Sequence, residues 1–337
     1  MERNQIRVGI IGCGAIGKEH MNRLTNIVPQ TKVVGVYDYF KDVADEMAEK
    51  YDAQSFASGE ELIQSDDIDA VLVTSTDDTH SGYVMDCLKK DKYVFCEKPL
   101  ALTADECAEM VEKEVALGHR LIQVGFNRRF DNGYRGIKQA IENGEIGEPL
   151  MIHSAHRNIS QALGFKTDYA ITRVAIHEID ITRWLLAEEY DEVQVLKVKQ
   201  SKRTNGDWLN PQLVMFKTRS GQIIDVEVQT DGAYAYDVQC QVVGEDGTLN
   251  LPDPATVVKR TKQSKHYQLG NDWATRFIDS YDTEFTEWAN SISDGKLVGP
   301  SAWDGYAACV TSDALIKSRV TGVPEKVELI AKPYLYK

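Results

Sequence analysis

Six residues near the N-terminus, Gly12-Cys13-Gly14-Ala15-Ile16-Gly17, have the spacing GxGxxG that could bind a dinucleotide. In such a site the first glycine allows a tight turn, the second lets the backbone approach a pyrophosphate, and the third lets a helix pack closely on a strand. The pattern alone is weak. Here it directly follows the apolar, β-branched run 6–11 and opens a predicted helix, which is the context that dinucleotide binding requires. The start of that helix would supply amide donors to the phosphates.

A carboxylate suited to the cofactor's ribose stands at the end of the second predicted strand, 32–38. Asp38 comes roughly 20 residues after the last glycine, where these folds place the acidic residue that accepts hydrogen bonds from the ribose hydroxyls. A carboxylate there repels a 2′-phosphate, and Tyr39-Phe40 offers no arginine to counter it. The sequence therefore favours NAD over NADP. The alternative is that the glycines only form a tight turn in another doubly wound fold.

Two further residues could carry acid–base chemistry. Lys98, in Glu97-Lys98-Pro99, follows the predicted strand 93–96, and the carboxyl edge of a parallel sheet is where such folds bind ligands. His177 lies in the predicted helix 171–186, and an imidazole with an ordinary pKa of ~6.5 can accept a proton near neutral pH. The alternative is that Lys98 is a solvated surface residue and His177 a structural one. His20 and His80 have no evident partners and are predicted to be structural or surface residues.

The elements that must position these residues alternate between strand and helix in the first part of the chain. This alternation predicts an α/β fold with a parallel sheet covered by helices on both faces. Strands are expected at 6–11, 32–38, 70–74, 93–96 and 120–124, and helices from the glycine motif to about 28 and at 41–51, 60–65, 79–91 and 103–117. The last of these helices begins with a capping box, with Thr103 at the N-cap and Glu106 three residues on.

The pattern changes near residue 125. From 192 to about 258 strand follows strand with turn signals between them, which predicts a large, mostly antiparallel sheet. Tyr234 and Tyr236 would alternate along one face of such a strand. We expect an NAD-binding Rossmann domain at 1–125 and a substrate-binding and oligomerisation domain at 126–337. The two final predicted helices, 272–293 and 301–321, are the segments that could pack back toward the first domain.

Composition narrows the class of protein. The chain has 337 residues, 42% of them hydrophobic, and a formal charge of −14, so its surface should repel nucleic acid and anionic lipid. No apolar run approaches the ~18 residues that a membrane span needs. The N-terminus lacks the apolar core of an export signal, and six scattered cysteines suggest free thiols in a reducing compartment, so we expect a cytoplasmic protein. No cysteine or histidine spacing indicates a metal site.

Together these stretches resemble the Gfo/Idh/MocA oxidoreductase family, and in particular its inositol-oxidising branch. The triplet Glu97-Lys98-Pro99 marks the broad family. The stretches that carry the resemblance are GCGAIGKEH (12–20), DAVLVTS (69–75), YVFCEKPLA (93–101), RLIQVGF (120–126), IGEPLMIHSAHRN (146–158), HEID (177–180), VGEDG (243–247) and AWDGY (302–306). They run along the whole chain. The resemblance implies a Rossmann domain, a second α/β domain with an open antiparallel sheet, and homotetramers built through the open sheets.

The resemblance also implies roles for individual residues. It makes Lys98 and His177 catalytic, with a cis peptide often preceding the proline of the triplet. It places Thr74, Glu97 and Lys98, with the glycine motif and Asp38, at the cofactor. The residues that it implies for the substrate are Arg128, His156, Asn158, Arg173, Asp180 and Tyr236.

One position departs from the family. Four residues before the histidine the family usually has Asp, whereas this chain has Arg173. One helical turn apart, an arginine that faces the pocket would disfavour the imidazolium that an aspartate stabilises. The alternative is that the long side chain of Arg173 turns away from the pocket. Asn127 is a second, smaller departure, from an apolar residue in the inositol branch.

These residues suit oxidation of a secondary alcohol. We expect NAD to take the hydride, His177 to accept the hydroxyl proton, and Lys98 to hold the alcohol oxygen and stabilise a developing alkoxide. The expected reaction converts inositol, myo or scyllo, to the keto-inositol. Two alternatives stay open: another sugar or a sugar acid whose carboxylate binds Arg173, and a sensor on the same fold that has lost catalysis.

Overall fold

The protein was analysed as a computed structural model that describes residues 5–204, 208–252 and 257–337. Residues 1–4, within the segment where no export signal was expected, lie outside the described part. The chain divides into two compact units. Unit 1 comprises Met1–Phe126, Tyr281–Cys309 and Leu329–Lys337, and unit 2 comprises Asn127–Ser280 and Val310–Glu328. The expected second domain, 126–337, is thus interrupted, because parts of its C-terminal region belong to unit 1.

Unit 1 is built on a six-stranded sheet in the order β3-β2-β1-β4-β5-β6, in which every neighbouring pair is parallel. The order reverses between β1 and β4, the point at which doubly wound sheets bind ligands beyond the carboxyl ends of their strands. The strands are β1 (Ile6–Ile11), β2 (Thr31–Tyr37), β3 (Gln54–Ser55), β4 (Ala70–Val73), β5 (Tyr93–Cys96) and β6 (Ile122–Val124).

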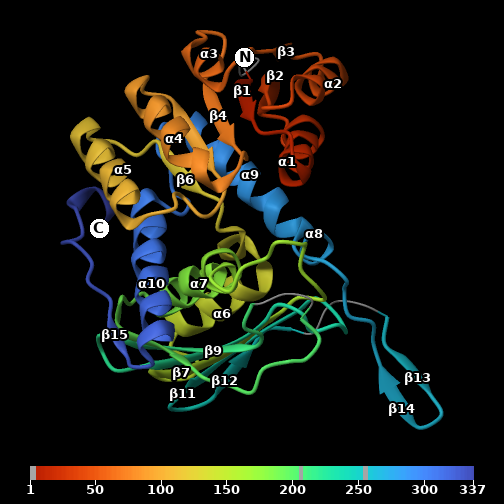
Figure 1. The fold of residues 1–337 in the computed structure, drawn as a ribbon, viewed down its shortest axis with the longest axis vertical. Coiled ribbons are helices and arrows are strands. Elements are labelled where there is room, and N and C mark those ends of the chain that lie inside the picture. The colour runs from red at the N-terminus through yellow and green to blue at the C-terminus, as the bar shows by residue number, and fades with distance from the viewer. Residues whose placement is uncertain (1–4, 205–207, 253–256) are drawn as a thin grey trace. The chain divides into compact units, whose positions relative to one another are not determined.

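The helices between these strands lie close to their predicted positions (Figure 1). They are α1 (Ala15–Asn26), α2 (Lys41–Tyr51), α3 (Gly59–Gln64), α4 (His80–Lys89) and α5 (Ala104–Leu117), with a short 3-10 turn η1 (Asp77–Thr79) before α4 and another, η4 (Tyr334–Tyr336), near the C-terminus. The capping box is confirmed, since the Thr103 side chain accepts from the Glu106 amide and the Glu106 side chain accepts in return. No helix in the described part of the chain has both the length and the apolar stretch needed to cross a membrane.

The core of unit 1 joins the sheet to a helix from the other end of the sequence. Helices α9 (Ile278–Ser293) and α10 (Ala302–Thr321) each contain a boundary between the units. Phe285 of α9 stacks on Phe95 of β5 with ring centroids 4.5 Å apart, and Trp288 is fully buried beside them. Burying such a side chain contributes roughly 1.5–3 kcal/mol relative to leaving it exposed. The C-terminal segment therefore completes the core under the N-terminal sheet.

Unit 2 is built on a seven-stranded sheet in the order β12-β11-β7-β10-β9-β8-β15. Only β7 and β10 are parallel, so the expected mostly antiparallel sheet is confirmed. The strands are β7 (Pro149–Arg157), β8 (Tyr190–Leu196), β9 (Gln212–Thr218), β10 (Ile223–Gln229), β11 (Asp237–Gly244), β12 (Thr248–Asn250) and β15 (Glu325–Lys326). A separate two-stranded hairpin contains β13 (Lys259–Thr261) and β14 (Ser264–His266).

The two faces of this sheet differ. Alternate side chains such as Ile152 and Val226 are fully buried, on the side where α7 contacts β7, whereas Met151 and Ile223 on the opposite side are 38% and 37% exposed. Figure 1 shows α6 and α7 along one side of the sheet. The other elements of unit 2 are η2 (Asn127–Phe130), α6 (Asn132–Glu142), η3 (Ala170–Ala175), α7 (Ile176–Leu186) and α8 (Trp273–Arg276).

The prediction that 171–186 is helical is confirmed, but the segment is not one continuous α-helix. Residues Ala170–Ala175 form a π-helix, and the α-helix starts only at Ile176. A π-turn closes hydrogen bonds from i to i+5 and is wider than an α-turn. Residues four apart across it therefore do not stack along one face, as the spacing of Arg173 and His177 had suggested.

Candidate active site

The glycine motif in unit 1 forms a turn that leaves space for a ligand. Gly12 has a φ of 98°, and a Cβ there would lie 2.5 Å from the backbone nitrogen of Ser75. A Cβ on Gly17 would lie 2.2 Å from the Gly12 carbonyl, to which the Thr74 hydroxyl donates a hydrogen bond of 2.6 Å. At Gly14, by contrast, a Cβ would meet no atom within 4 Å. The first and third glycines are thus required by packing, and the second leaves the backbone open.

The amides at the start of α1 are available to an anion. Its N-cap residue makes no side-chain cap, and its first turn, with Ala15 and Ile16, contains no acidic residue. A helix N-terminus of this kind attracts phosphate through its amide groups and its dipole. These features fit the pyrophosphate of a dinucleotide.

Asp38 lies directly after β2 and is tied to the glycine turn. One carboxylate oxygen accepts a hydrogen bond of 2.7 Å from the Cys13 amide, and the other accepts one of 2.9 Å from the Phe40 amide. The carboxylate therefore has a fixed position beside the motif. A fixed anion suits two ribose hydroxyls and opposes a 2′-phosphate, so the residues present fit NAD.

Glu97, which follows β5, is held by a residue that the sequence did not connect to it. His20 Nε2 lies 2.9 Å from a Glu97 carboxylate oxygen, and the other oxygen accepts a hydrogen bond of 3.1 Å from the Lys98 amide. Burial would raise the pKa of Glu97, but the hydrogen bond with His20 and the charge and backbone amide of Lys98 outweigh burial and hold that pKa below its usual value. Glu97 is a buried carboxylate that fixes the backbone at Lys98.

His20 is fully buried, and it has partners that the sequence did not reveal. Burial lowers its pKa despite the neighbouring Glu97, so the ring is neutral at physiological pH. A neutral ring that donates from Nε2 must accept at Nδ1, where Arg23 Nη1 lies 3.4 Å away. Arg23 in turn pairs with Asp282 of α9 at 3.0 Å. These contacts form a chain of polar side chains that ends at the Lys98 backbone.

His80 also has partners that the sequence did not reveal. Its Nδ1 lies 2.7 Å from the Pro99 carbonyl, and its Nε2 lies 3.2 Å from the Ser75 carbonyl. The Lys98–Pro99 peptide is cis, as the resemblance implied, and Lys98 itself is half-buried. His80 therefore ties the turn after β5 to the turn after β4.

Unit 2 gathers three of the residues expected at the substrate and the expected catalytic His177, together with one residue that was not expected. Arg128 Nη1 donates to Glu178 Oε1, and Arg128 Nη2 lies 3.1 Å from His156 Nδ1. The same Nδ1 lies 3.1 Å from Glu178 Oε2, while the Tyr236 hydroxyl lies 3.3 Å from His156 Nε2. The His177 ring centroid is 6.1 Å from that of His156. Arg128, His156, Tyr236 and His177 therefore share one neighbourhood, organised by Glu178.

Glu178 is ionised in this cluster. Burial would raise its pKa, but the charge of Arg128 and the hydrogen bond with His156 outweigh burial and hold the pKa below its usual value. Because a carboxylate only accepts and a guanidinium only donates, Nδ1 of His156 can serve only one of them at a time. Donation to the charged carboxylate is the stronger bond, and it leaves Nε2 of His156 as an acceptor.

Asn158 supplies a second acceptor near this cluster. It follows His156 by two residues, and its amide continues the sheet by donating 2.8 Å to the Gln229 carbonyl. Its side-chain Oδ1 is buried and has no hydrogen-bond partner among the described residues. A buried acceptor without a partner is costly, so this atom suits a ligand's hydroxyl donor.

Other expected residues have partners within the protein. Both carboxylate oxygens of Asp180 accept from Arg129, one of them at 2.8 Å from Arg129 Nε. Arg173 is exposed, with its guanidinium carbon 3.8 Å from the Tyr169 ring centroid. Tyr234 and Tyr236 precede β11 rather than alternating along it, because the strand begins at Asp237, and Tyr234 is exposed while Tyr236 is buried. Asn127, the second departure, is buried and donates 3.1 Å to the Ser280 hydroxyl.

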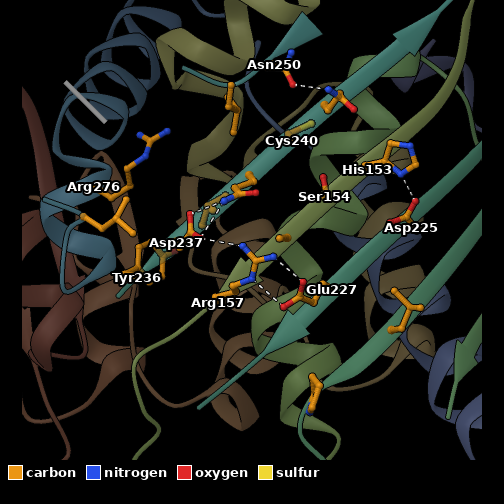
Figure 2. Close-up of a pocket in the computed structure, with 18 of the residues that line it drawn as sticks. His153, Ser154, Arg157, Asp225, Glu227, Tyr236, Asp237, Cys240, Asn250 and Arg276 are labelled. Carbon is orange, nitrogen blue, oxygen red and sulfur yellow. Dashed lines mark hydrogen bonds and ion pairs between the residues drawn. The ribbon is translucent and has the colours of Figure 1, made fainter. Parts of the chain in front are cut away.

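The opposite face of the unit 2 sheet carries a hollow of about 860 Å³ along β7, β10 and β11. Figure 2 shows Arg157 in this hollow between Glu227 and Asp237, at 2.8 Å and 2.9 Å, and His153 beside Asp225. Because side chains alternate along β7, His153 and Arg157 lie on the face opposite His156. Tyr236, whose hydroxyl lies near His156, also lines this hollow.

Sequence reasoning missed three residues of these networks. Glu178 stood inside the HEID stretch and His20 inside the glycine stretch, but the sequence connected neither residue to its partners. Arg23 lies three residues after His20 on α1, and this helical spacing was the one signal that could have paired them.

A doubly wound parallel sheet with an open glycine turn, a fixed Asp38 and a second α/β unit defines the class of NAD-dependent dehydrogenases. Comparison with known proteins identifies the group within that class. Residues 6–126 match the oxidoreductase family with an NAD-binding Rossmann fold, and residues 138–329 match its C-terminal alpha/beta domain. The chain belongs to the Gfo/Idh/MocA oxidoreductase family.

Individual relatives cover nearly the whole chain. Inositol 2-dehydrogenase of Burkholderia cenocepacia is 44% identical over 98% of this chain and 99% of its own, and that of Klebsiella pneumoniae is 45% identical over the same shares. The crystal structure of myo-inositol dehydrogenase from Lactobacillus casei in complex with NAD(H) and myo-inositol matches with a TM-score of 0.95 and 36% identity. That match covers 99% of this chain and 100% of the other.

Proposed function

We propose that this chain oxidises a ring secondary alcohol of inositol, myo or scyllo, to the keto-inositol with formation of NADH. The observation that carries the proposal is the near-complete match, in sequence and in fold, to inositol dehydrogenases, including one bound to NAD(H) and myo-inositol. The buried polar cluster of unit 2 supports it independently, because a cyclic polyol is a ring of hydroxyl groups that needs many polar partners.

The substrate's hydroxyl groups bind to the acceptors that this cluster presents. Oδ1 of Asn158 accepts from them, and a substrate hydroxyl replaces the Tyr236 hydroxyl at the single lone pair of His156 Nε2, so that the Tyr236 hydroxyl can also bind substrate. Arg128 supplies its charge to Glu178 and holds the ring of His156 in place. The cluster therefore recognises the positions of the substrate's hydroxyl groups through side chains whose orientation is fixed before the substrate binds.

Proton transfer and oxygen binding are divided between two residues. His177 accepts the proton of the reacting hydroxyl, and Lys98 holds its oxygen and stabilises the developing negative charge. The hydrogen-bond chain from Arg23 through His20 and Glu97 fixes the Lys98 backbone for this role. NAD, when bound, supplies the hydride acceptor.

The open face of the unit 2 sheet is the surface through which copies of the chain assemble, as a homotetramer. Two observations support this assembly. Met151 and Ile223 are partly exposed apolar side chains on the open face, and the hollow lies on the same face. We place the enzyme in the cytoplasm, because its six cysteines are all buried thiols, which suit a reducing compartment.

The proposal is tested by NADH absorbance when the protein and NAD are mixed with a panel of inositols, hexoses and sugar acids. We expect the largest kcat/KM for an inositol. A larger kcat/KM for a sugar acid would show that a sugar acid is the substrate. Tight NAD binding with no turnover on any member of the panel would indicate a sensor.

A further inference from the structure

The hairpin of β13 and β14 in unit 2 differs from the rest of the chain in its charge. Residues 259–266 contain Lys259, Arg260, Lys262 and Lys265 and no acidic residue, although the whole chain has a formal charge of −14. All eight residues are exposed. Among the residues that the structure describes, none of these four cations forms an ion pair, so their charge is presented to the surroundings.

The hairpin's own sequence does not favour its formation in isolation. Arg260 stands directly opposite Lys265 across the two strands, and like charges in that position are destabilising. The turn consists of Lys262 and Gln263 with φ of 48° and 63°, a left-handed pair that two-residue hairpins usually fill with Asn-Gly. A two-stranded hairpin without further strands is at best marginally stable in water. A contact outside the hairpin, bearing negative charge, would offset these costs.

The base of the hairpin adds an apolar part to this surface. Val257 is 89% exposed, and Tyr267 is 36% exposed. Tyr267 and Leu269 also line the hollow on the open face of the sheet, so the hairpin continues directly from that face. An apolar base beside a charged rim is the usual composition of a protein interface. Figure 1 shows no helix or other strand of unit 2 beside β13 and β14.

We infer that residues 257–267 form an arm that binds the acidic surface of a second copy of this chain. The partner is a second copy because the arm is continuous with the face proposed for assembly, and because the chain's own net charge is complementary to the arm. The inference rests on the proposed assembly. It assigns to the arm the electrostatic part of the contact, which weakens as salt rises.

The test compares two triple variants. In the arm variant Lys259→Glu, Lys262→Glu and Lys265→Glu are combined. In the control Lys32→Glu, Lys50→Glu and Lys90→Glu make the same charge change at three exposed lysines of unit 1. Sedimentation velocity over a range of protein and salt concentrations gives the dissociation constant of the assembly. We expect the arm variant to raise it by tenfold or more at low salt and to reduce its salt dependence, with a smaller change in the control.

A second measurement places the contact. Carbodiimide joins a lysine to a carboxylate that touches it, and equal mixtures of ¹⁴N and ¹⁵N protein, unfolded and refolded together, show by mass spectrometry whether the joined peptides come from different chains. We expect mixed-isotope pairs that contain Lys262 or Lys265. The inference is overturned by a monomeric wild type, by equal weakening in both triple variants, or by arm peptides joined only within one chain. Loss of binding to heparin in the arm variant with unchanged assembly would assign the arm to a polyanion instead. NADH formation, measured separately, shows whether the dehydrogenase function stands in each case.

Discussion

The side chains around Glu178 show how a buried charge can set the chemistry of its neighbours. The carboxylate pairs with Arg128 and leaves one oxygen for His156, so the histidine keeps its proton on Nδ1. Its Nε2 then presents a lone pair, which is what a polyol hydroxyl needs. In unit 1, Glu97 fixes the Lys98 backbone in a similar way, with a neutral His20 as donor. In both units the residue expected to meet substrate is oriented by a buried carboxylate.

Replacing Glu178 should change the tautomer of His156. In Glu178→Gln the amide can donate to Nδ1, so the proton moves to Nε2 and the ring becomes a donor toward the substrate. We expect kcat/KM for inositol to fall by about 10–100-fold, since removed hydrogen bonds to charged groups are worth about 1.5–3 kcal/mol. The ¹⁵N chemical shifts of His156 report the tautomer directly in wild type and variant. Protonated Nε2 in the wild type would contradict the assignment without reference to activity.

The same variant has a predictable effect on stability. The pKa of Glu178 is lowered in the folded state, so its contribution is present above the unfolded value of ~4.3 and is lost as pH falls through the folded value. At pH 7 we expect Glu178→Gln to lower the free energy of unfolding by about 1.5–3 kcal/mol, and the difference from wild type to shrink below about pH 4. Urea unfolding at several pH values measures it. A difference that does not change with pH would show that Glu178 is not charged in the fold.

Lys98 and His177 should be essential for turnover and dispensable for cofactor binding. General acid–base groups contribute ~10²–10⁴-fold, and we expect Lys98→Ala and His177→Ala each to lose activity in that range. NAD affinity by fluorescence titration should stay within a few-fold of wild type. Near-normal activity in either variant would remove that residue from the mechanism.

At the scale of elements, much of unit 1 follows from local sequence, because each buried strand, cap and glycine is determined by its neighbours. The capping box at Thr103 and the turn at Gly12 are examples. The π-turn before His177 could not be predicted, since its six residues fit an α-helix equally well and its i→i+5 bonds depend on tertiary packing. The partners of His20 and Glu178 were missed for a related reason. Apart from Arg23, these partners come from segments distant in the sequence, and a single sequence contains no signal for such contacts.

The end of β2 should decide which cofactor is used. Asp38→Ser combined with Tyr39→Arg removes a fixed anion beside the glycine turn and adds a phosphate partner. We expect kcat/KM for NADP relative to NAD to rise by roughly 100-fold, because like-charge juxtaposition costs several kcal/mol. Initial rates with both cofactors measure the ratio. Efficient use of NADP by the wild type would contradict the role of Asp38.

The π-turn also bears on Arg173, where the chain departs from its family. The sequence favoured an arginine facing the pocket, but the side chain is exposed and stacked on Tyr169, and the wider turn takes it out of line with His177. We therefore expect Arg173→Asp to leave both the pH dependence of kcat/KM and the ratio of myo- to scyllo-inositol oxidation within about twofold of wild type. Arg173→Met, which keeps an apolar contact with Tyr169, is the control. If only the aspartate variant shifts the acidic limb of the pH–rate profile or changes the isomer ratio, residue 173 belongs to the active site. A sugar acid would then again be a candidate substrate.

At the scale of the whole molecule, the chain joins two sheets of opposite character. The parallel sheet of unit 1 is buried and presents strand ends, where the cofactor motif lies, whereas the sheet of unit 2 has one face toward its helices and one open. The strand ends of a parallel sheet suit a cofactor, and a broad open face suits the assembly that we propose.

The central claim is that this chain transfers hydride from an inositol ring carbon to NAD. The most direct measurement incubates the purified protein with NAD and ¹³C-labelled myo- or scyllo-inositol, follows NADH by absorbance, and identifies the product by NMR. The account predicts one keto-inositol for each NADH formed, with at least one of the two isomers. NAD binding without NADH from either isomer, or NADH formed only from a hexose or sugar acid, would contradict it.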